Sequence, residues 1–140
     1  MEDLFVYAIL FSVGYDTWPE FSSTLDTLFL ENSDNTDLLE LEYMQPKDAI
    51  LHTLSLMNTY EIDIGLFGKS LMREINKLYA GIGNLSKFSC KMYEIWKRLP
   101  VSIEYGTEPF FTLNYAGDCL DYGDEKQCVE LFEKAVNFYN

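Results

Sequence analysis

At 140 residues and 48% hydrophobic side chains, the chain is long enough to bury a core of its own, and its 16% aromatic content excludes a disordered acidic tail. Its net charge of −13 disfavours direct binding to nucleic acid or to anionic membrane, because both require an excess of lysine and arginine. We expect a single domain over residues 1–140.

The first predicted element is the apolar segment 4–13. It is apolar on every side, which indicates burial whatever its type. A helix with Gly14 after its end is the preferred interpretation, although its Val, Ile, Phe and Tyr residues also suit a strand. The segment is too short to cross a bilayer, which needs roughly 20 apolar residues.

A second helix is predicted from Thr17 to about Glu31. Thr17 and Glu20 have the spacing of a capping box, and Pro19 suits the first turn. Apolar residues then recur at helical spacing from Phe21 onward.

The next segment is ambiguous. Asp37 and Glu40 form a second candidate capping box, which favours a helix. However, Leu39, Leu41 and Tyr43 alternate with acidic residues, and this pattern is typical of a short strand.

Four further helices are expected from apolar spacing and cap residues. They cover about residues 46–57, 66–79, 87–99 and 125–136, with Pro46 in the first turn of the first and with Ser86 and Asp124 as N-caps of the last two.

Residues 101–105 and 110–115 are rich in strand-forming side chains. The turn-forming segment 106–109 between them predicts a small β-hairpin. The expected fold class is therefore mainly α, a compact domain of about five to seven helices with a hairpin near residues 101–115, and α+β is the alternative.

No pattern in the sequence indicates an enzyme, a metal or a cofactor. His52 is the only histidine and is interpreted as a core or boundary residue, because a general base needs a nucleophile and an orienting carboxylate nearby. Cys90, Cys119 and Cys128 lack the spacing of metal ligands and suit a reducing cytoplasm. The acids of residues 118–125 lack the alternate spacing of a calcium loop.

The charge is unevenly divided along the chain. Residues 1–68 carry −12 with Lys47 as their only base, residues 69–98 carry +5, and residues 99–140 carry −6. Such segregation favours a partner selected by electrostatics, whereas the alternative is an acidic surface that serves only solubility. The row Lys69, Arg73 and Lys77 follows one helix face, and we expect it to balance acids within the fold; whether it is also an interface stays open.

Two acidic segments are the predicted surfaces for a basic protein partner, residues 16–42 and residues 115–125, and the second has tyrosines interleaved. Tyrosine combines apolar area with a polar tip, and aromatic anchors in a charged surround are typical of tight interfaces. Carboxylates on such a surface can imitate phosphates in the basic cleft of a nuclease. The candidate partner-binding residues are Asp34, Asp37, Glu40, Glu42, Tyr115, Asp118, Asp121, Tyr122, Asp124 and Glu125.

In size, acidity, its acidic start after Met1 and the tyrosine-acid stretch Tyr115–Glu125, the chain resembles bacterial immunity proteins. The resemblance is one of general character and carries no residue roles. It implies a cytoplasmic, non-enzymatic antagonist that binds a toxin in a fixed ratio and either covers the toxin's active site or blocks it from an adjacent surface. The alternative hypothesis is a helical adaptor or regulatory subunit, and a homo-oligomer could be built on segment 4–13.

Overall fold

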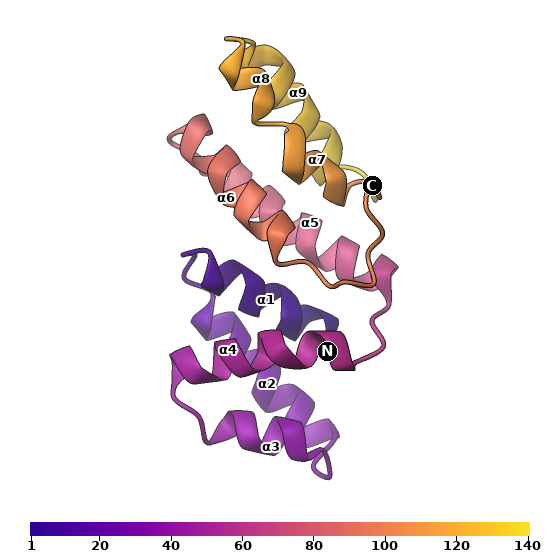
Figure 1. Ribbon diagram of the computed structural model, residues 1–140. Coiled ribbons are helices and arrows are strands. Elements are labelled where there is room, and N and C mark those ends of the chain that lie inside the picture. The colour runs from indigo at the N-terminus through magenta and orange to yellow at the C-terminus, as the bar shows by residue number, and fades with distance from the viewer. The chain divides into compact units, whose positions relative to one another are not determined.

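The computed structural model describes residues 1–140, and the protein is all-helical (Figure 1). Nine α-helices and one short 3-10 helix follow one another, without a strand. The mainly α prediction is confirmed. The helices outnumber the expected five to seven because residues 110–121 contribute two short ones.

Contacts within the chain divide it into two compact units, Met1–Asp63 and Ile64–Asn140, and each is described by itself. The expectation of one domain over residues 1–140 stays a prediction. Neither unit contains a helix that is long and apolar enough to cross a membrane.

The first unit is built from four α-helices. They are α1 (Glu2–Ser12), α2 (Trp18–Glu31), α3 (Thr36–Glu42) and α4 (Pro46–Leu56), and the 3-10 turn Met57–Thr59 continues the last of them. Helix α1 packs against α2 and α4, and α3 packs against the same two helices (Figure 1).

Residues 4–12 of the apolar segment 4–13 lie in α1 and Val13 is its C-cap, so the helical interpretation is confirmed. Seven side chains of the segment are buried, and Leu4 and Ala8 join residues of the other three helices in one core cluster. Each large apolar side chain that leaves water contributes roughly 1.5–3 kcal/mol. Gly14 follows the helix with φ of 106°, a conformation that favours glycine.

The capping hydrogen bonds of two helices in this unit differ from those expected. Thr17 is the N-cap residue of α2, as expected, but its side chain makes no capping hydrogen bond and its hydroxyl donates to the carbonyl of Tyr7 at 2.7 Å. Helix α3 is capped by Asn35, whose side chain accepts a hydrogen bond from Leu38 N at 3.2 Å, and not by Asp37. The strand alternative is wrong here, because this cap starts a helix that buries Leu38 and Leu41 three residues apart.

The second unit has five α-helices. They are α5 (Ile64–Ala80), α6 (Leu85–Lys97), α7 (Phe110–Tyr115), α8 (Asp118–Asp121) and α9 (Glu125–Val136). Helix α7 packs against α6 and α9, and α9 also packs against α5 and α8 (Figure 1). Asn84 caps α6 in place of the expected Ser86, since its side chain accepts from Lys87 N at 2.9 Å.

The predicted hairpin near residues 101–115 is wrong. Residues 101–109 form turns, and the carboxylate of Glu108 accepts hydrogen bonds from Thr112 N at 3.0 Å and Thr112 Oγ1 at 2.6 Å. These bonds satisfy donors of the first turn of α7. Phe110 and Leu113 are each 1% exposed. Their burial at helical spacing therefore outweighs the strand preference of the segment.

The basic row on α5 is partly neutralised within its own helix. Arg73 and Lys77 lie 3.5 and 3.2 Å from the carboxylate of Glu74, which is only 9% exposed. One balancing acid therefore comes from α5 itself.

Close packing at Gly68 connects three parts of the second unit. A Cβ added at Gly68 would overlap the Tyr139 hydroxyl and lie 3.0 Å from Phe110 Cζ. Gly68 therefore allows α5 to approach both the C-terminal residues and α7.

We expect Gly68→Ala to lower the free energy of unfolding by about 1–3 kcal/mol, because overlap with Tyr139 outweighs the better helix propensity of alanine. Urea unfolding measures the change. Gly83→Ala is the control, because nothing lies within 4 Å of a Cβ added there. A gain in stability from Gly68→Ala would contradict the packing described here.

Candidate functional site

A groove between α2 and α3 is the most distinctive surface of the first unit. It has a volume of about 520 Å³. This lies within the range of roughly 300–1,000 Å³ typical of binding pockets. The residues that line it are Asp26, Phe29, Leu30, Leu39, Glu42 and Tyr43.

The groove has the same composition on both sides. Asp26, Phe29 and Leu30 follow the spacing i, i+3, i+4 on α2. Leu39, Glu42 and Tyr43 follow that spacing on α3 and its C-cap residue, which is Tyr43. Residues at this spacing share one helix face. Each helix therefore contributes one acid and two apolar side chains to the same groove.

Three of the four apolar side chains of the groove are exposed to solvent, while Phe29 is partly buried against the core. Leu30 and Tyr43 are each 82% exposed, and Leu39 is 39% exposed. The buried cluster of the unit is formed by other residues of these helices, among them Leu25 and Leu38. The core therefore does not account for the exposed side chains.

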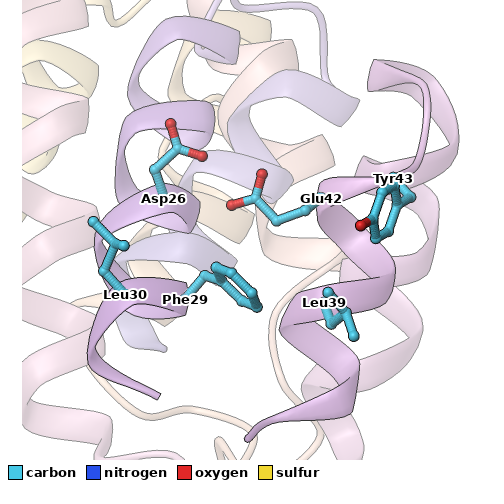
Figure 2. A pocket seen from close by; sticks show the side chains of 6 residues that line it. All are labelled: Asp26, Phe29, Leu30, Leu39, Glu42 and Tyr43. Carbon is cyan, nitrogen blue, oxygen red and sulfur yellow. The ribbon is translucent and has the colours of Figure 1, made fainter. Parts of the chain in front are cut away.

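Two carboxylates from different helices meet in the groove. Figure 2 shows the carboxyl groups of Asp26 and Glu42 pointing toward one another, with the ring of Phe29 directed toward α3. Partial desolvation, a hydrogen bond with Asp26 and the negative charge of Asp26 together raise the pKa of Glu42 above its ordinary value.

No base of the chain neutralises this pair. Neither Asp26 nor Glu42 lies within ion-pair distance of a lysine or arginine, and the same holds for the other six carboxylates of residues 16–42. The groove therefore has no lysine or arginine beside its two acids.

The predicted partner-binding residues of the first unit have different surroundings. Asp34 and Glu40 are exposed, and Glu40 lies 3.6 Å from His52 Nε2. Asp37 accepts a hydrogen bond from the Tyr60 hydroxyl at 2.8 Å, which gives it a structural role. Of these predicted residues, Glu42 is the one that lines the groove.

The predicted partner-binding residues of the second unit also differ in their surroundings, because some contact other groups of the fold and others are exposed. Asp124 caps α9 by accepting a hydrogen bond from Gln127 N at 3.0 Å, and Glu125 lies in the first turn of that helix. The ring of Tyr115 packs against that of Phe111 at 5.3 Å, whereas Tyr122 is 83% exposed.

Asp118 and Asp121 line a cavity of about 550 Å³, together with Tyr93, Glu94 and others. Glu94 is neutralised by Lys97 at 2.9 Å and Arg98 at 2.7 Å, and hydrogen bonds from both bases lower its pKa. One acid of this cavity therefore has two bases beside it, whereas neither acid of the α2–α3 groove is within ion-pair distance of a lysine or arginine. The two sets of predicted residues belong to different units, so each is considered as a separate surface.

Sequence reasoning missed most of the groove. Asp26, Phe29, Leu30, Leu39 and Tyr43 were not among the predicted site residues. The available signal was the pair of matching i, i+3, i+4 triplets, in which Leu30 and Tyr43 lie away from the buried stripes of their helices.

Chemically reactive groups do not gather in either unit. No group of three or more His, Cys, Asp and Glu residues could hold a metal ion. His52 lies at the boundary of the first unit, with its side chain 32% exposed. All three cysteines are free, and burial raises the pKa of the Cys128 thiol.

Comparisons with family models, with curated proteins and with solved structures find no match to this chain. Its function is therefore inferred from the surfaces described above.

We expect Glu42→Gln to stabilise the protein at neutral pH and to have little effect in acid. A carboxyl group whose pKa is raised on folding contributes stability below its ordinary value of 4.5, and this contribution is lost as pH rises through the folded value. Glutamine stays neutral and can still donate to Asp26.

Urea unfolding at about pH 7 and about pH 3.5 measures this effect. Asp34→Asn, which removes one charge from an exposed turn, is the control. An equal gain from both variants at pH 7 would show that Asp26 and Glu42 do not interact.

Asp124→Ala should lower the free energy of unfolding by about 1 kcal/mol, because it removes the N-cap of α9. Asp121→Ala removes an exposed acid of α8 and should change stability by less than about 0.5 kcal/mol. Equal losses in thermal or urea unfolding would contradict the capping role.

Proposed function

We propose that this chain is a non-enzymatic acidic protein that binds and neutralises a basic protein partner. The observation that carries the proposal is the separation of charge between the two units. Met1–Asp63 holds thirteen carboxylates and one lysine, a net −12, while Ile64–Asn140 holds ten carboxylates and nine bases, a net −1. A unit with so little internal neutralisation attracts cationic surfaces over long range.

Charge alone would serve solubility as well as binding. The second support is that the negative unit also exposes apolar side chains in the α2–α3 groove, including Leu30 and Tyr43. Electrostatic attraction speeds encounter, and apolar contact then slows dissociation.

The specific form of this proposal is a bacterial immunity protein. Such a protein acts in the cytoplasm, binds its cognate toxin in a fixed ratio and covers the toxin's active site. A nuclease is the most suitable basic toxin, because a cleft that holds phosphates also attracts carboxylates.

A helical adaptor or regulatory subunit is the second candidate. It is favoured by Val101 and Tyr105, each 79% exposed, beside a chain of aromatic contacts from Tyr93 through Trp96 to Phe111. Six apolar side chains of α1 are buried, while Tyr7 and Phe11 are partly buried. Sedimentation at several concentrations tests self-assembly.

The proposed function is tested by pull-down of the products of the reading frames that flank this one, followed by an activity assay of the captured protein. We expect a basic protein to be bound in a fixed ratio and to lose its activity. The proposal is wrong if the full chain binds none of these products or leaves the captured protein active.

With that partner, Asp34→Lys/Glu40→Lys should slow association by about tenfold at low salt, and the difference should shrink at about 0.5 M NaCl. Asp118→Lys/Asp121→Lys makes the same change of charge on the second unit and should have a smaller effect. Stopped-flow fluorescence measures both rates. Association unaffected by either change would contradict electrostatic selection of the partner.

A further inference from the structure

The α2–α3 groove carries two features that the fold does not require. Asp26 and Glu42 approach one another although their negative charges repel, and Leu30 and Tyr43 stay exposed although they are apolar. Both features cost free energy or solubility in the isolated chain. Both costs are relieved when one ligand supplies a positive charge and an apolar surface together.

The chain itself does not supply that charge. Lys47 is the only base of the first unit, and it forms no ion pair. The complementary cation therefore has to come from another molecule.

We propose that the α2–α3 groove is the docking site for a segment of the partner protein that presents one arginine side chain between apolar side chains. This inference rests on the proposed function and names the surface and the chemistry through which the partner is recognised. The arginine is bound by Asp26 and Glu42, and its apolar neighbours pack on the exposed side chains of α2 and α3.

Arginine suits this pair of carboxylates better than lysine does. Its planar guanidinium carries five N–H donors and can bond two carboxylates at once, whereas the lysine ammonium is a strongly hydrated point charge. Its methylene stem also adds apolar contact along the groove.

The matched i, i+3, i+4 triplets on α2 and α3 favour an amphipathic helix as the partner segment. A helix presents side chains at i, i+3 and i+4 on one face, and such a face lies readily in a groove between two helices.

The experiment is an NMR titration of the ¹⁵N-labelled full chain with a synthetic helical peptide that carries Leu, Arg and Leu on one face. The control peptide replaces the arginine with glutamine. We expect the arginine peptide to shift amide signals of α2 and α3 and to bind at least about tenfold more tightly than the control peptide.

Two double variants locate the site. Asp26→Asn/Glu42→Gln removes both charges of the groove with little change of shape, and Asp118→Asn/Asp121→Asn removes two charges from the second unit. We expect the groove variant to weaken binding of the arginine peptide by about tenfold and the control variant to weaken it by less than about twofold. Circular dichroism confirms that both variants are folded.

Equal weakening by the two variants, signal shifts outside α2 and α3, or equal binding of the two peptides would overturn the inference. The same variants are then tested with the partner identified by pull-down. If the groove variant binds that partner as tightly as the wild type, the docking site is wrong while the proposed function stands. If the wild type binds no partner, the proposed function itself fails.

Discussion

The first unit must fold with thirteen carboxylates and a single lysine, and its architecture depends on how this imbalance is accommodated. Helix α1 is apolar on nearly every side and occupies the interior, where Leu4 and Ala8 meet the apolar stripes of the other helices. The carboxylates are consequently left on the surface. Burial of α1 therefore stabilises a unit whose surface charges repel one another.

In the second unit, lysine and arginine side chains form ion pairs with acids of the same unit. Glu74 lies beside Arg73 and Lys77, and Glu94 lies beside Lys97 and Arg98. Its core rests on aromatic contacts such as the edge-to-face pair Phe88–Phe132 at 5.0 Å. In the proposed function, the negative unit is the part that meets a basic partner.

Most helices were predictable because their apolar residues recur at helical spacing, and α1, α2, α4, α5, α6 and α9 lie close to the expected ranges. The hairpin error arose because α7 is specified by contacts that composition does not show. Glu108 supplies its first hydrogen bonds, and burial of Phe110 and Leu113 outweighs strand propensity.

The candidate site was less accessible to sequence reasoning than the fold. The sequence showed the acidic segments, but it did not show that Asp37 accepts a hydrogen bond from Tyr60 or that Asp124 caps α9. Facing triplets become a groove only when two helices pack, and the approach of Asp26 to Glu42 depends on that packing. The spacing of residues along one helix indicates which of them share a face. It does not indicate which face of another helix packs opposite them.

The most direct test of unrelieved repulsion in the first unit is its stability as a function of salt. Trp18 stacks on the buried Phe21 at 5.3 Å, so its fluorescence in a Trp96→Phe variant reports unfolding of the first unit. At pH 7, the account predicts that the free energy of unfolding in urea rises by about 1 kcal/mol or more between about 0.02 and 0.5 M NaCl, because salt screens the repulsion. A Trp18→Phe variant, in which Trp96 reports the near-neutral unit, should show a smaller rise. If the free energy measured through Trp18 falls or stays constant with salt, the carboxylates of the first unit do not repel one another as described.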